Sequence, residues 1–116
     1  MSVITPFGRF MRLYRLRHNL LLKDISKKLG WTASYLVNLE NGHRDLPLAG
    51  CQKIEQDLGF SGEDLREFRA CADLTVKRFD IRPATPEAAR LAGAFCRRLN
   101  SLTPGEREQL MAVLGE

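Results

Sequence analysis

The stretch GWTASYLVNLENG, residues 30–42, decides the fold of this chain. Thr32 offers a hydroxyl that can accept a hydrogen bond from the free N–H groups at a helix start, and the closing Asn-Gly pair suits a helix end. Leu36 and Leu39 are three residues apart, so they share one face of such a helix. The stretch therefore predicts a short helix with a buried leucine stripe and a polar outer face.

A second short helix is expected directly before it, from about Leu22 to Leu29. Ile25 and Leu29 would face inward, and Gly30 would form the turn between the two helices. Two short helices joined through a glycine turn form a helix-turn-helix, whose second helix enters the major groove of DNA. The sequence therefore indicates a protein that binds DNA sequence-specifically.

The charge distribution agrees with this interpretation. Residues 1–44 carry eight basic and two acidic side chains, a net charge of +6, whereas residues 45–116 carry a net charge of −2. A concentrated positive field is the footprint of a surface that faces phosphate. By charge alone, a solvated basic face without a partner is equally consistent. The coincidence of the positive half with the motif favours double-stranded DNA.

Several other classes of protein find no support in the composition. No apolar run approaches the ~20 residues of a membrane span, and no signal peptide is evident. The three cysteines are far apart and include no Cys-x-x-Cys pair, so free thiols in a reducing cytoplasm are expected. His18 and His43 have no cysteine or carboxylate cluster around them, and no phosphate loop or serine nucleophile motif occurs. We therefore expect a cytoplasmic protein without a catalytic site, cofactor or metal.

The remaining pattern predicts an all-α fold. Further helices are expected from Thr5-Pro6 to about Arg17, from near Pro47 to Leu58 and from about Gly62 to Asp73. With the two helices above, they form a five-helix DNA-binding domain over residues 1–73. Residues 74–116 form an extension, with an extended segment or short strand at 75–81 and helices over about 86–99 and 104–114.

Several short motifs occur at fixed spacings in the first 66 residues. They include DISKKLG at 24–30 and LENG at 39–42, together with Phe7-Gly8, Met11-Arg12, Tyr14-Arg15, Tyr35-Leu36, Pro47 and Leu58-Gly59. With these motifs, residues 5–66 resemble the lambda-repressor-like, or XRE, family of helix-turn-helix domains. The resemblance implies a five-helix domain that usually works as a dimer on a palindromic operator.

The resemblance also implies residue roles. Ala33, Ser34 and Asn38 match positions that contact base edges, and Arg15 and Glu40 match an internal salt bridge. The positions that match contacts with the DNA backbone are Thr32, Tyr35, Asn41, His43 and Arg44.

The sequence departs from the family pattern at the start of the helix over 22–29. Leu21 and Leu22 stand where the family has a Ser or Thr cap and a phosphate-contacting Gln. Lys23 is expected to supply the missing phosphate contact. Trp31 occupies the turn position usually held by a residue such as Val, and we expect it to be half buried, bracing the turn.

Function and assembly leave alternatives open. A dimeric transcriptional repressor of bacterial or phage origin is the first hypothesis, and an antitoxin that binds a small toxin and autoregulates is the second. An adaptor without DNA binding is a third. For the extension, a homodimer interface is expected, with a tail that only completes a monomeric core as the alternative. The residues expected in that interface are Val76, Phe79, Leu91, Phe95 and Leu99.

Overall fold

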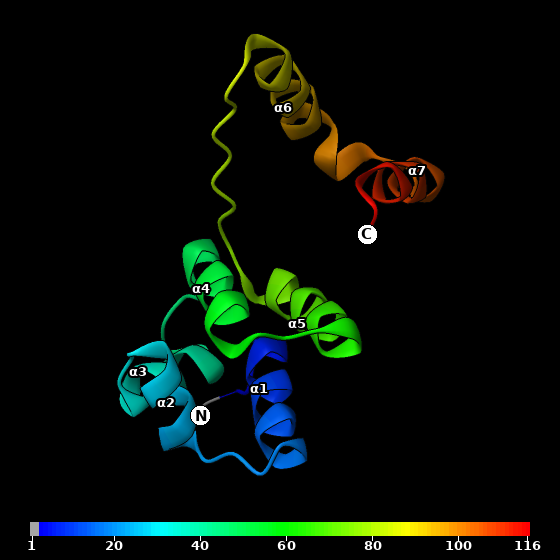
Figure 1. Cartoon of the computed structure of the whole chain (residues 1–116). Coiled ribbons are helices and arrows are strands. Elements are labelled where there is room, and N and C mark those ends of the chain that lie inside the picture. The colour runs from blue at the N-terminus through cyan, green and yellow to red at the C-terminus, as the bar shows by residue number, and fades with distance from the viewer. Residues whose placement is uncertain (1–2) are drawn as a thin grey trace. The chain divides into compact units, whose positions relative to one another are not determined.

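The computed structural model describes residues 3–116, and every regular element in them is a helix (Figure 1). The all-α class expected from the sequence is confirmed. The chain divides into two compact units, one up to Phe79 and one over Asp80–Glu116. The first unit contains α1 (Pro6–Arg17), α2 (Leu22–Leu29), α3 (Ala33–Glu40), α4 (Leu48–Leu58) and α5 (Gly62–Thr75). The second contains α6 (Pro86–Arg98), the 3₁₀ turn η1 (Leu99–Ser101) and α7 (Pro104–Leu114).

Local signals set the ends of the first helices. Thr5 Oγ1 accepts a hydrogen bond from the Gly8 N–H at 2.9 Å, which caps α1. α2 has no hydroxyl cap. The Asp24 carboxylate instead accepts a bond from the Leu21 N–H at 2.7 Å. α2 ends at Gly30, whose φ of 70° lies in the left-handed region that glycine tolerates best.

The core of the first unit lies between α1 and the four helices around it. α1 packs against α5 and α3, and α2 packs against α4 and α3. Edge-on and tilted ring contacts join α1 to α5 and to the α4–α5 turn; their members are Phe7, Phe10, Tyr14, Phe60 and Phe68. This cluster fixes α1, and α1 in turn supports α3.

The end of α5 differs from the sequence expectation. α5 extends to Thr75 rather than Asp73, and Thr75 Oγ1 accepts a hydrogen bond from the Phe7 N–H at 3.1 Å. Val76 follows and is buried in the same core. The compact unit therefore continues past residue 73, the boundary expected from the sequence, and includes the start of the extended segment.

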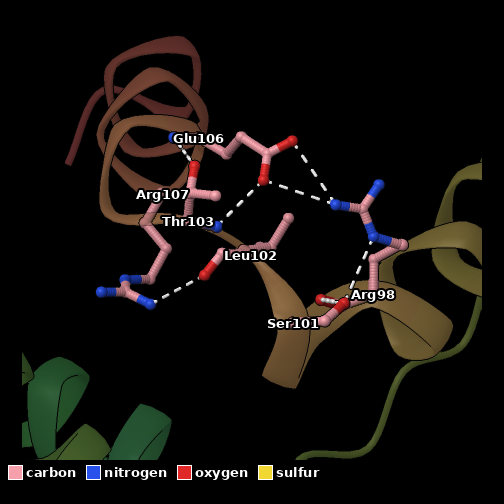
Figure 2. Close-up of polar contacts among 6 residues, drawn as sticks. All are labelled: Arg98, Ser101, Leu102, Thr103, Glu106 and Arg107. Carbon is pink, nitrogen blue, oxygen red and sulfur yellow. Dashed lines mark hydrogen bonds and ion pairs between the residues drawn. The ribbon is translucent and has the colours of Figure 1, made fainter.

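The second unit is built differently from the first. Within Asp80–Glu116, no residue is buried. The joint between α6 and α7 is held by polar contacts (Figure 2): the Glu106 carboxylate accepts from the Thr103 N–H at 2.9 Å and lies 3.4 Å from Arg98 Nη2. Arg107 donates to the Leu102 carbonyl at 3.1 Å. These bonds set the start of α7 without an apolar core.

The extended segment was expected over residues 75–81. Residues 76–83 contain no helix and no strand, and Val76 has extended backbone angles. The short strand was one of the two expected forms, and the structure shows the other, an extended segment without strand pairing. None of the helices in residues 3–116 combines the length and the apolar character needed to cross a membrane.

Candidate nucleic-acid interface

α3 presents small side chains on its outer side. Ala33 and Ser34 are exposed and Asn38 is partly exposed, whereas Leu36 and Leu39 are completely buried. Ser34 and Asn38 are four residues apart, so they lie on the same face one turn from each other. The helix therefore combines an anchored inner stripe with an outer face on which polar groups can reach a ligand.

The start of α3 is braced by two aromatic rings. Thr32 Oγ1 accepts a hydrogen bond from the Tyr35 N–H at 3.0 Å. Trp31 is partly buried, as expected, and packs against the core and edge-on to Tyr35 with ring centroids 5.2 Å apart. The Arg44 guanidinium lies 5.4 Å from the centroid of the Tyr35 ring. Tyr35 thus joins the start of α3 to the loop that follows it.

The α2–α3 turn is closed by one small side chain. The Ser26 hydroxyl donates to the carbonyl oxygen of Trp31, and the Ser26 carbonyl accepts from the N–H groups of Gly30 and Trp31. Ser26 therefore supplies a hydrogen bond to the Trp31 carbonyl, which would otherwise lack this partner in the turn.

The loop after α3 has a fixed backbone and exposed side chains. The N–H groups of His43 and Arg44 both donate to the Asn38 carbonyl, at 2.9 and 3.1 Å. Both side chains are exposed, as is Lys23 on α2. Positive or polar groups on a rigid frame suit contacts with phosphate, which fix register without reading sequence.

A buried ion pair links α1 to the end of α3. The Glu40 side chain is 1% exposed, and Arg15 contacts it twice, with Nη1 2.5 Å from Oε2 and Nη2 3.3 Å from Oε1. Arg12 joins the same carboxylate, with Nε 3.5 Å from Oε1, and donates to Asn41 Oδ1 at 2.8 Å. Sequence reasoning missed Arg12. Its i, i+3 spacing from Arg15 was the signal that could have found it.

The backbones of α1 and α3 also meet directly. The N–H and the hydroxyl of Thr5 both donate to the Glu40 carbonyl, at 2.9 and 3.0 Å. A Cβ at Gly8 would overlap that carbonyl oxygen, so only glycine allows the approach. The position of α3 is therefore set by α1 through backbone contacts as well as charge.

The residues expected in a dimer interface fall in two environments. Val76 is 6% exposed and lies in the core of the first unit. Phe79, Leu91, Phe95 and Leu99 are exposed, at 53, 71, 37 and 47%. Leu91 and Phe95 on α6 and Leu99 on η1 are therefore large apolar side chains that stay exposed within the second unit.

Titratable groups with shifted pKa values lie away from α3. Burial raises the pKa of the Cys51 thiol to about 11, and burial also raises the pKa of Cys71 and of Tyr14. Residues 3–116 contain no group of three or more His, Cys, Asp or Glu side chains placed to hold a metal ion. Cys51 and Tyr14 are core residues and Cys71 packs against the core, so none of the three belongs to the α3 surface.

The anchored helix, the left-handed glycine turn before it and the cations around it define a helix-turn-helix DNA-binding protein. Residues 11–65 match the helix-turn-helix family model, which confirms the resemblance of this part of the chain to XRE, or lambda-repressor-like, domains. This match supports a DNA-binding transcriptional regulator. No curated protein and no solved structure matches the chain.

Proposed function

We propose that the protein is a dimeric repressor that reads a palindromic duplex operator with the outer face of α3. The observation that carries the proposal is the exposure of Ala33, Ser34 and Asn38 on a helix whose opposite side is completely buried. Because a helix-turn-helix places this face against base edges, these three side chains are the readers. Repression would follow from occupation of a promoter by the protein.

Each reader has a definite chemistry. The Asn38 amide can pair with N6 and N7 of adenine, and the Ala33 methyl can contact a thymine methyl. The Ser34 hydroxyl can form a hydrogen bond with more than one kind of base. The groups proposed to contact the DNA backbone surround them; they are Thr32, Tyr35, Asn41, His43, Arg44 and Lys23. The ion pair between Arg15 and Glu40 fixes the end of α3 against α1.

Selection of bound duplexes from a random library tests the proposal directly. A palindromic consensus is expected, because a two-fold dimer reads two equal half-sites. On the selected duplex, Asn38→Ala should weaken binding by about 1–3 kcal/mol and relax one base position. Gln109→Ala, which removes an exposed amide on α7, is the control. An equal loss for Asn38→Ala on random DNA would contradict base reading.

The proposed dimer places the α6 face against the same face of a second copy. Isolated helices shorter than about 12–15 residues are marginal in water, and no residue of Asp80–Glu116 is buried to support them. The ends of α6 are oppositely charged, with Glu87 in its first turn and Arg97 in its last. An antiparallel pairing brings the acidic first turn of each α6 near the basic last turn of its partner, and the small Ala92 lies near the centre of the apolar stripe.

Sedimentation of the full chain tests this arrangement. Leu91→Asp and Phe95→Asp should each produce a monomer, because a carboxylate would be buried in the apolar contact. Ala89→Asp, on an exposed position outside the stripe, should leave the dimer intact. A dimer that survives Leu91→Asp excludes α6 as the interface.

The antitoxin alternative uses the same exposed side chains on α6 and η1 for a small protein partner. A single chain in sedimentation, together with a small partner that co-purifies and is lost with Leu91→Asp, would favour it. The free thiols of Cys51, Cys71 and Cys96 agree with the cytoplasmic location that we propose for either function.

A further inference from the structure

Arg12 connects the buried ion pair to the loop after α3. Its Nε lies 3.5 Å from Glu40 Oε1, and its Nη2 donates to Asn41 Oδ1 at 2.8 Å. The Arg12 side chain is 47% exposed, whereas that of Arg15 is 15% exposed. The Arg12 guanidinium therefore connects the buried Glu40 carboxylate with Asn41, a residue proposed to contact the DNA backbone.

We propose that Arg12 is a positioning residue that fixes the Asn41 amide for a contact with DNA phosphate, an inference that rests on the proposed function. A guanidinium only donates hydrogen bonds, so the Asn41 atom that faces it is the amide oxygen. The amide nitrogen, the donor that a phosphate requires, is then turned away from Arg12. Arg12 thus selects which end of the amide is offered to the ligand.

The rest of Asn41 is already fixed without Arg12. Its backbone N–H donates to the Val37 carbonyl at 3.0 Å, and Gly42 after it adopts a φ of 76°. The side-chain torsions are the freedom that remains, and ordering such a side chain costs conformational entropy on binding. A bond made in the free protein removes part of that cost, so Arg12 should raise DNA affinity through Asn41.

Electrostatics offers a competing role for Arg12. Two guanidinium groups share the Glu40 carboxylate, so the cluster keeps a net positive charge beside Asn41. Arg12 could therefore attract phosphate directly. Arg12→Lys separates the two roles. Lysine keeps the charge but, as a compact ammonium on a flexible stem, does not reproduce the planar fork that contacts Glu40 and Asn41 together.

The test compares Arg12→Lys, Arg12→Gln, Asn41→Ala and the corresponding double variants by fluorescence anisotropy on the selected duplex. Both Arg12 variants should lose affinity about three- to tenfold, the equivalent of one net hydrogen bond. In the Asn41→Ala background, the same changes should cost less than about twofold. Arg9→Gln, which removes an exposed cation from the same helix, is the charge control. Thermal unfolding establishes that each variant is folded.

Full affinity for Arg12→Lys, or an undiminished loss in the Asn41→Ala background, would overturn the inference. A second readout does not need DNA. Nitrogen-15 relaxation of the Asn41 side-chain amide in the free protein should show a rigid group that becomes mobile in both Arg12 variants, while Asn38 is unchanged. If the wild-type protein binds no duplex but the Asn41 amide is still rigid only when Arg12 is present, the proposed function fails and the positioning contact stands. An Asn41 amide equally mobile in wild type excludes the positioning role even where DNA binding is strong.

Discussion

Arg15 and Glu40 form a two-point ion pair between α1 and α3, with nitrogen–oxygen distances of 2.5 and 3.3 Å. The carboxylate is nearly inaccessible to water, so it depends on these contacts for the hydrogen bonds it lost on burial. The pair fixes the end of the helix that we propose reads DNA. Its removal should therefore affect stability and binding together.

Arg15→Met should lower the free energy of unfolding by about 3 kcal/mol, because it removes the main partner of a buried charge. Urea unfolding at pH 7 measures the change. The double variant Arg15→Met/Glu40→Leu removes both charges and should recover most of the loss. If the double variant is no more stable than Arg15→Met, the cost does not come from an unpaired carboxylate.

Gly8→Ala tests the close backbone contact between α1 and α3. The added methyl would overlap the Glu40 carbonyl, so the two helices must separate, and we expect a loss of about 1–3 kcal/mol in urea unfolding. Gly105→Ala is the matched control, since nothing besides its chain neighbours and its own helix backbone lies within 4 Å of its Cβ position. The control should be neutral or slightly stabilising. A Gly8→Ala protein as stable as the control would contradict the contact.

Cys51 should make stability depend on alkaline pH. Burial raises the pKa of its thiol from 9.0 to about 11, so the folded chain keeps a proton that the unfolded chain loses above pH 9. This stabilisation is complete below pH 9 and is lost as the pH rises through about 11; it amounts to about 2–3 kcal/mol. Urea unfolding of wild type and Cys51→Ala from pH 8 to 11 measures it. Parallel curves for the two proteins would contradict the prediction.

Cysteine accessibility gives a second prediction from the same group. Cys96 is exposed, Cys71 is partly buried and Cys51 is buried. Because the thiolate is the reactive form, Cys96 should react first with a disulfide reagent at pH 8, and Cys51 last. Mass spectrometry of the labelled peptides gives the order. Labelling of Cys51 as fast as Cys96 would show that the core opens readily.

Glu106 should report on the start of α7 at acid pH. Hydrogen bonds from the Thr103 backbone and hydroxyl, and then the Arg98 charge, lower the pKa of Glu106 below 4.5. The stabilisation is present above pH 4.5 and is lost as the pH falls through the lower pKa of the folded chain. The Thr103 amide resonance should therefore titrate with a midpoint below 4.5, and Glu106→Gln should abolish that titration. A midpoint at or above 4.5 would mean that the cap is not formed.

Most of the first unit could be predicted because its signals are local. α2 and α3 have the expected bounds, since a hydroxyl cap, a leucine stripe and a glycine turn all act within a few residues. The extension of α5 to Thr75 depends on a hydrogen bond to Phe7, 68 residues away in sequence. No local pattern contains such a contact.

The candidate site could also be predicted only in part. The exposed positions of α3 follow from helical periodicity, whereas the Arg12 contact with Asn41 requires the packing of α1 on α3. Val76 shows the same limit, because its apolar character suited an interface but the core of its own unit covers it. Local pattern thus identified the surface of α3, and tertiary packing determined its supports.

The close contact at Gly8 should have an effect that a genetic selection can detect. Because α1 approaches the end of α3 there with only a hydrogen atom between the two backbones, any larger residue should displace α3 as a whole. Mutants selected for loss of the proposed operator binding should then include changes at this one glycine, on a helix that carries none of the proposed base contacts. Their phenotype should be partly reversed at low temperature or by stabilising changes elsewhere in the core, whereas a change at Asn38 should not respond to either.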